Sequence, residues 1–156
     1  GHDHGPCLAE NLARAESAFR EKGMTLTSLR RRVLMEVAAS HKAMGAYEIL
    51  DRLAQKHGRR LAPISVYRAL DALLETGLVH RLESRNAFFA CHAEHERGGA
   101  EHRAVLLCER CGTVAEIDGR DVIRSVAGDA RKLGFRSRLA TIEILGQCRQ
   151  CQDGDE

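Results

Sequence analysis

The hydrophobic positions of the first 77 residues recur every three or four places, which is the spacing of one buried helix face. Gly23 and Gly77 stop this pattern where helices are expected to end, and Gly45 interrupts it before a third helix. The pattern predicts four helices: over 7–22, after an N-cap at Thr27, over 46–57, and over 65–76 with Ser65 as a cap.

Two short strand-like segments follow, over 78–83 and 87–91, joined by the turn residues 84–86. Helices followed by a small hairpin are typical of a winged helix-turn-helix. Residues 93–101, with a Gly98-Gly99 pair, are predicted to be a linker.

The remainder alternates between strand and helix patterns, with strands over 103–107, 113–117 and 136–145 and a helix over 122–133. The predicted fold is therefore α+β, with a winged-helix domain over 1–92, a linker over 93–101 and a small α/β domain over 102–156. A unit of this size needs a metal, a partner subunit or both to be stable.

Composition narrows the class of protein. The 156 residues are 44% hydrophobic and 29% charged, as in a folded soluble chain. No apolar run has the roughly 18 residues of a membrane span, and no secretion leader is present, so we expect a cytoplasmic protein without a membrane partner. Residues 1–5 are set aside as a possible expression remnant.

Charge is distributed unevenly along the chain although its net value is only +2. Residues 1–86 carry 14 Lys and Arg against 10 Asp and Glu, and the rest carries 10 against 12. The excess of positive charge in the winged-helix part is compatible with a nucleic-acid partner there.

Four of the six cysteines form two C-x-x-C pairs, Cys108 with Cys111 and Cys148 with Cys151. Two such pairs can close a tetrahedral shell of four thiolates with no open position, which is the pattern of structural zinc. Reduced buried thiols or a redox disulfide are the alternatives, but neither pair has the sequence context of a catalytic C-x-x-C.

A second group of potential ligands gathers around the predicted linker: His80, Cys91, His92, His95, Glu101, His102 and Glu116. A metal there would set the angle between the two domains. One thiolate among imidazole and carboxylate ligands favours zinc over iron or manganese. The alternative is a solvated polar linker whose histidines bind nothing.

The helix predicted over 65–76 has the chemistry of a recognition helix. Arg68 can donate two hydrogen bonds to guanine, and Ser65 and Tyr67 can contact phosphate, sugar or base. The arginines of 30–32 and 59–60 would add counterion release on DNA binding, although an arginine run is often only a solvated face.

Taken together, these motifs resemble the ferric uptake regulator family over about residues 9–151. The matching stretches are Leu26-Thr27-Ser28-Leu29-Arg30-Arg31-Arg32-Val33-Leu34, Ala46-Tyr47-Glu48-Ile49-Leu50, Ser65-Val66-Tyr67-Arg68-Ala69-Leu70, Gly77-Leu78-Val79-His80 and the two C-x-x-C pairs. The resemblance implies a DNA-binding domain joined to a dimerisation domain, a homodimer, and metal-dependent repression.

Within the family, the chain is most similar to zinc-sensing members. That similarity implies a regulatory zinc site at His80, Cys91, His102 and Glu116, with His95 as the alternative to His102. It also implies DNA contacts by Tyr47 and Arg68. Iron and peroxide sensors usually carry His-His-x-His before the first C-x-x-C, where this chain has Arg103 and Val105.

The expected function is therefore a zinc-responsive transcriptional repressor of zinc uptake genes, with one structural and one regulatory zinc per subunit. Its expected partners are double-stranded operator DNA and a second copy of the chain, with no small-molecule substrate. Alternatives are an iron- or peroxide-responsive regulator on the same scaffold, or a zinc-ribbon module that binds a protein. No pairing of nucleophile and base indicates an enzyme.

Overall fold

A computed structural model of the chain describes residues 4–90 and 102–155. The chain divides into two compact units, Gly1–His92 and Ala93–Glu156. Among the described residues, none of the helices combines the length and the apolar character that a bilayer crossing requires.

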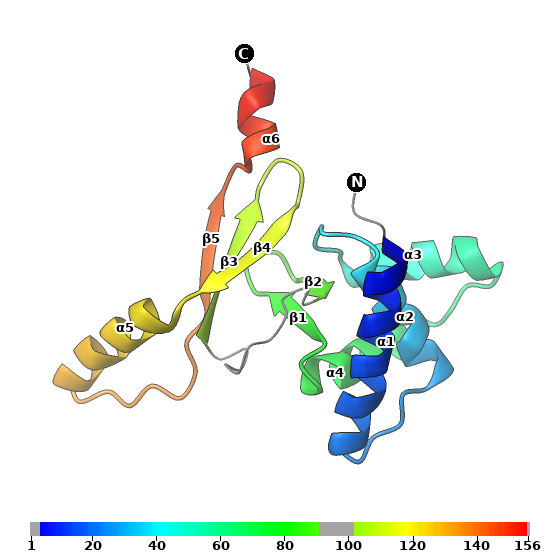
Figure 1. The fold of residues 1–156 in the computed structure, drawn as a ribbon, viewed down its shortest axis with the longest axis horizontal. Helices are drawn as coiled ribbons and strands as arrows, with labels where there is room; N and C mark the ends of the chain where they lie inside the picture. Colours follow the sequence, from blue (N-terminus) through cyan, green and yellow to red (C-terminus); the bar gives the residue numbers. More distant parts are fainter. Residues whose placement is uncertain (1–3, 91–101, 156) are drawn as a thin grey trace. The chain divides into compact units, whose positions relative to one another are not determined.

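The first unit contains four helices and a hairpin (Figure 1). Strands β1 and β2 pair antiparallel, and Met44 exchanges backbone hydrogen bonds with Phe88, which ties the segment before α3 to the hairpin. The predicted winged helix is confirmed, with bounds α1 His4–Glu21, α2 Ser28–Ala38, α3 Ala46–His57, α4 Pro63–Glu75, β1 Val79–Leu82 and β2 Ala87–Ala90.

Local chemistry explains where α2 and α4 begin. The Thr27 hydroxyl accepts a hydrogen bond from the backbone N–H of Arg30 at 3.3 Å, as expected of an N-cap. The prediction that Ser65 caps α4 is wrong, because the helix begins at Pro63, whose fixed φ suits the first helical position. Helix α1 also begins earlier than predicted, at His4.

The core of the first unit lies between α2, α3, α4 and the hairpin, and α1 is attached to it through Ala15 and Phe19. Its largest fully buried side chains are Phe19, Met44, Ile49, Leu50, Leu53, Leu70, Leu73, Leu82, Val33, Val37, Val66 and Val79. Burial of these side chains is the main force that holds the four helices together.

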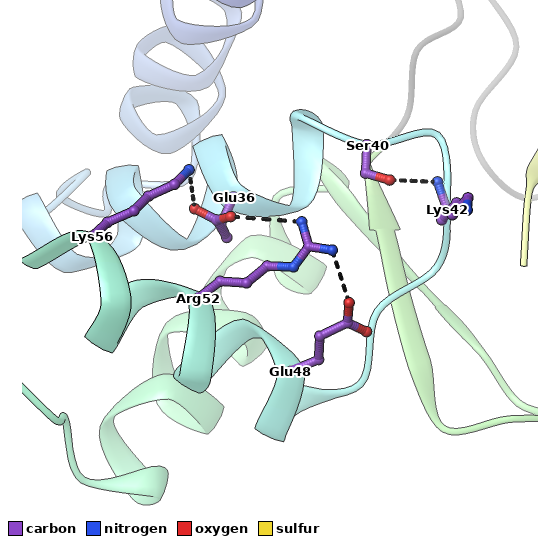
Figure 2. Close-up of polar contacts among 6 residues, drawn as sticks. All are labelled: Glu36, Ser40, Lys42, Glu48, Arg52 and Lys56. Carbon is purple, nitrogen blue, oxygen red and sulfur yellow. Dashed lines mark hydrogen bonds and ion pairs between the residues drawn. The ribbon is translucent and has the colours of Figure 1, made fainter.

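One carboxylate interrupts this apolar packing. Glu36 of α2 is only 3% exposed, and its carboxylate accepts a hydrogen bond from Nζ of Lys56 in α3 at 2.7 Å. Arg52 of α3 lies 4.0 Å from the other carboxylate oxygen and also donates to Glu48 at 2.9 Å (Figure 2). The buried charge is thus shared by two cations from α3, which joins α2 to α3.

Replacing Lys56 with alanine is expected to lower the free energy of unfolding of the first unit by about 1 to 3 kcal/mol, because Glu36 would lose its hydrogen-bonded cation. The matched control is Lys42→Ala, at an exposed lysine also drawn in Figure 2. This variant is expected to change the free energy of unfolding by less than about 0.5 kcal/mol. Urea titrations of both variants measure the difference, and equal stabilities would contradict the role of this ion pair.

The second unit is a three-stranded sheet, with α5 in the connection from β4 to β5 and α6 after β5 (Figure 1). The strand order is β4-β3-β5, with β3 antiparallel to β4 and parallel to β5. The elements are β3 Arg103–Cys108, β4 Val114–Asp118, α5 Arg120–Lys132, β5 Ile142–Gly146, α6 Arg149–Gln152 and a 3-10 turn Asp153–Asp155.

The sequence pattern overestimated the last strand. The predicted strand over 136–145 is observed only from Ile142 onward, because residues 133–141 return the chain from α5 to the sheet. A parallel pair needs such a crossover, so part of the apparent strand is connection. Helix α6, which begins after Cys148, was not predicted.

The second unit leaves much of its apolar surface uncovered within the chain. No residue of α5 is buried, and Val122 and Val126 on this helix are more than half exposed. Phe135, Leu139 and Ile144 are also exposed. So much exposed apolar surface on a unit of this size is typical of a surface that binds another molecule.

Candidate metal centre and nucleic-acid interface

The two C-x-x-C pairs meet at one end of the three-stranded sheet. Cys108 is the last residue of β3, and Cys111 lies in the turn that leads to β4. Parallel pairing places Cys108 opposite Gly146 at the end of β5, and the backbone N–H of Glu109 donates to the Gly146 carbonyl at 2.8 Å. The register of β3 and β5 therefore brings the second pair, on either side of the start of α6, to the first.

The four sulfur atoms form a compact cluster, each within 4.8 Å of the others. The Sγ atoms of Cys111 and Cys148 are 3.7 Å apart, and the four thiols are free rather than joined in disulfides. Tetrahedral zinc with Zn–S bonds of about 2.3 Å requires sulfur atoms about 3.8 Å apart. The donor set and its spacing fit zinc, and four thiolates leave no position for a substrate.

Neighbouring groups prepare the cluster for anionic sulfur. Backbone N–H groups of Cys111 and Cys148 point at Cys108 and lower the pKa of its thiol to about 6. The hydroxyl and backbone N–H of Thr113 lower the pKa of Cys111. Desolvation, and then the Cys148 side chain, raise the pKa of Cys151 to about 12. The Cys151 thiol therefore loses its proton beside Cys108 only when a cation balances the added negative charge.

Two residues that support this cluster were not predicted from the sequence. The hydroxyl of Thr113 lies 3.1 Å from Sγ of Cys111, and the Arg110 guanidinium donates to the Cys151 carbonyl at 3.0 Å. Arg110 lies between the first two cysteines and Thr113 just beyond them, so proximity to the motif was the available signal.

The residues of the expected regulatory site are divided between the two units. His80 is half-buried in β1, with its ring 5.6 Å from that of Phe89. His102 is exposed just before β3, and Glu116 lies in β4. Cys91 and the alternative ligand His95 lie outside the described residues. In the parts that are described, the four-cysteine cluster is the one group of three or more potential ligands brought together.

Glu116 is held by a partner that sequence reasoning did not assign to it. Nη1 of Arg103 donates to Oε2 of Glu116 at 3.0 Å, and both side chains are largely buried. Arg103 and Glu116 are near neighbours across the β3–β4 ladder, where Val105 is directly opposite Glu116. The strand register was the missing information, because it decides which side chains share a face.

The expected DNA-contacting residues lie near the starts of α3 and α4. Arg68 is exposed on α4, one turn after Ile64, whereas Ser65 and Tyr67 are half-buried and Tyr67 also packs against the core. Tyr47 is 63% exposed in the first turn of α3. Exposed side chains near the N-terminus of a recognition helix are placed to contact base edges.

The arginines of α2 have a structural part in the first unit. The Arg30 guanidinium lies 5.6 Å above the Phe19 ring and donates to the Thr25 carbonyl at 2.6 Å. Arg31 donates to Glu16 of α1 at 2.8 Å. These two cations hold α1 against α2, which leaves Arg59 and Arg60, exposed before α4, as the better candidates for phosphate contacts.

Comparison with known proteins agrees with these features. Residues 21–145 match the model of the ferric uptake regulator family. The chain belongs to this family. The zinc uptake regulation protein of Escherichia coli K12 is 37% identical over 142 residues, which cover 91% of this chain and 81% of that protein.

Solved structures of the same family have the same fold. A zinc uptake regulator complexed with zinc and DNA is 35% identical, with a TM-score of 0.85 over 95% of this chain and 97% of that one. The crystal structure of holo XcZur is 38% identical, with a TM-score of 0.78 over 94% and 99% of the two chains. The predicted α+β family fold is therefore confirmed.

Proposed function

We propose that this member of the ferric uptake regulator family is a zinc-responsive transcriptional repressor that binds operator DNA as a homodimer and controls zinc uptake genes. The observation that carries the proposal is the likeness, over nearly the whole chain, to a zinc uptake regulator complexed with zinc and DNA. The exposed Arg68 on a helix-turn-helix supplies the matching chemistry in this chain.

The two units divide the work. Residues 1–92 form the DNA-binding domain, in which Tyr47, Ser65, Tyr67 and Arg68 contact DNA. Residues 93–101 are the linker, and residues 102–156 form the dimerisation and metal-binding domain. The exposed apolar side chains on and after α5 support dimerisation, because a second copy would cover them.

Zinc at Cys108, Cys111, Cys148 and Cys151 is the structural ion. When bound, it supplies the positive charge that keeps the four thiolates together. These cysteines tie the chain after β5 to the end of β3, across β4, α5 and β5, which lie between them in sequence. The cluster thereby stabilises a small unit with few fully buried residues.

A second, exchangeable zinc ion binds at His80, Cys91, His102 and Glu116 and is the signal. His80 belongs to the first unit, and His102 and Glu116 belong to the second, so ligation by this set favours one arrangement of the two. A change from 1:99 to 99:1 between two arrangements requires about 5.5 kcal/mol of differential binding. The Arg103 guanidinium, which donates to Glu116 at 3.0 Å, holds that carboxylate in place until it is a ligand.

An iron- or peroxide-responsive regulator is the weaker alternative. Arg103 occupies a position where iron sensors of the family place a histidine, and here it makes an ion pair with Glu116. A zinc-ribbon module that binds protein is also weaker, because the winged helix would then have no role. The family and the relatives that the chain matches are regulators, which supports a role other than catalysis.

The proposed function is tested by fluorescence anisotropy with a labelled DNA duplex taken from the region upstream of the coding sequence of this protein. We expect zinc-loaded protein to bind this duplex about a thousandfold more tightly than chelator-treated protein at the same ionic strength. Arg68→Ala is the matched variant, and we expect it to lose roughly 1 to 3 kcal/mol of sequence discrimination while keeping its fold. Equal binding with and without zinc would contradict the proposal.

A further inference from the structure

The outward face of α4 has a charge pattern that limits what it contacts. Apart from Pro63 at its first position, its exposed side chains form one stripe with helical spacing: Ile64, Arg68, Asp71 and Glu75. The last two are acids and are repelled by phosphates. Contact with DNA along this stripe is therefore confined to the first two turns, which hold Ile64 and Arg68.

Ile64 stands out on this stripe because it is apolar. Within residues 12–90, the structure leaves two large apolar side chains more than half exposed, Tyr47 at 63% and Ile64 at 58%. Both lie in the first turn of a helix, and these helices are α3 and α4 of the helix-turn-helix. An exposed β-branched residue adds little to helix stability, so folding does not explain Ile64.

We propose that Ile64 determines sequence specificity by packing against the C5-methyl group of a thymine one or two base steps from the base read by Arg68. The inference rests on the proposed DNA-binding function and adds a residue to its readout. The thymine methyl is the one apolar group on the major-groove edges of the four bases. An apolar side chain in the groove thus has one chemically matched partner.

The spacing along the helix fits this reading. Ile64 and Arg68 are four residues apart on one face, which is about 6 Å of helix rise. Successive base pairs are about 3.4 Å apart. The two side chains consequently reach bases separated by one or two steps, so a thymine close to a guanine in each half-site is the expected recognition element.

Replacing thymine with uracil removes this methyl group and changes nothing else on the major-groove edge. The probe is a duplex selected from random sequences by the zinc-loaded wild-type dimer. A panel of variants of this duplex carries uracil in place of each thymine in turn, at the symmetry-related positions of both half-sites. For the wild-type protein, one symmetric pair of these thymine replacements is expected to weaken DNA binding. The expected loss is about fourfold for each methyl removed, or about 15-fold for the two half-sites together.

Ile64→Ala is expected to bind the duplex with thymine about 15-fold more weakly than wild type. It is also expected to lose discrimination between thymine and uracil at the one position where the wild-type protein shows it. Glu75→Ala, on the same stripe in the last turn, is the matched control and should show the wild-type affinities for all duplexes of the panel. Thermal melting of the free variants reports any loss of fold.

Two results would overturn the inference. If uracil in place of thymine weakened DNA binding by Ile64→Ala in the same pattern as for wild type, no methyl contact would involve this residue. Equal weakening of Ile64→Ala on every duplex, selected or random, would indicate a sequence-independent role. Failure of wild type to select any sequence in a zinc-dependent way would instead refute the proposed function, and this inference with it.

Discussion

Cys151→Ser is expected to unfold the second unit while the first unit stays folded. Structural zinc sites contribute on the order of 10 kcal/mol, and small domains are stable by only about 5 to 15 kcal/mol in total. The cluster also carries the link between the end of β3 and the start of α6, where the Cys148 N–H donates to Sγ of Cys108 at 3.3 Å. Loss of one thiolate therefore removes most of the unit's stability.

Circular dichroism, size-exclusion chromatography and zinc analysis of the purified variant measure this effect. We expect both zinc ions per subunit to be lost, because the proposed regulatory set also draws His102 and Glu116 from the unfolded unit. The helical signal of the first unit should be retained and the dimer should dissociate. Cys7→Ser is the matched control, since it removes a thiol outside both C-x-x-C pairs. A Cys151→Ser protein with wild-type melting and zinc content would contradict a structural role for the cluster.

Cys91→Ser is expected to abolish zinc-dependent operator binding without unfolding either unit. The thiolate is the soft ligand of the proposed regulatory set, and its loss weakens zinc binding there while Cys108, Cys111, Cys148 and Cys151 keep their ion. Affinity for the operator should fall by about a thousandfold or more, to the non-specific level. Cys91 lies outside the described residues, so this prediction follows from the family resemblance.

Operator titrations in a zinc-buffered series at fixed salt measure the change, and Cys7→Ser again serves as the control. Zinc content should fall from about two ions per subunit to about one, in keeping with loss of the exchangeable ion alone. The assignment of Cys91 would be wrong if the variant kept the wild-type zinc response. It would also be wrong if the variant dissociated into monomers, since that would indicate a structural role.

Local patterns in the sequence were sufficient for much of this protein. The helical spacing of apolar residues predicted α2 and α3 because a helix with one apolar stripe has one face to bury. Thr27 and the glycines predicted helix ends because their conformations and hydrogen bonds are local. The C-x-x-C spacing predicted a four-thiolate cluster because one turn brings two sulfurs together.

Other features depended on residues far apart in sequence. Pairing of β3 with β5 is parallel and needs the α5 crossover, and only this register carries Cys148 and Cys151 to Cys108 and Cys111. The partner of Glu36 is 20 residues away on another helix, and that of Glu116 is set by the β3–β4 register. A periodic pattern gives no information on either pairing.

The sequence by itself thus determined most of the elements, their order, and the four cysteines that the structure brings together, because these follow from short-range spacing. Tertiary structure decided which charges pair, which arginines support α1 rather than face solvent, and that Ile64 is left exposed on α4. The physical reason is that burial and partnership belong to packed surfaces, and a surface exists only after distant segments have come together.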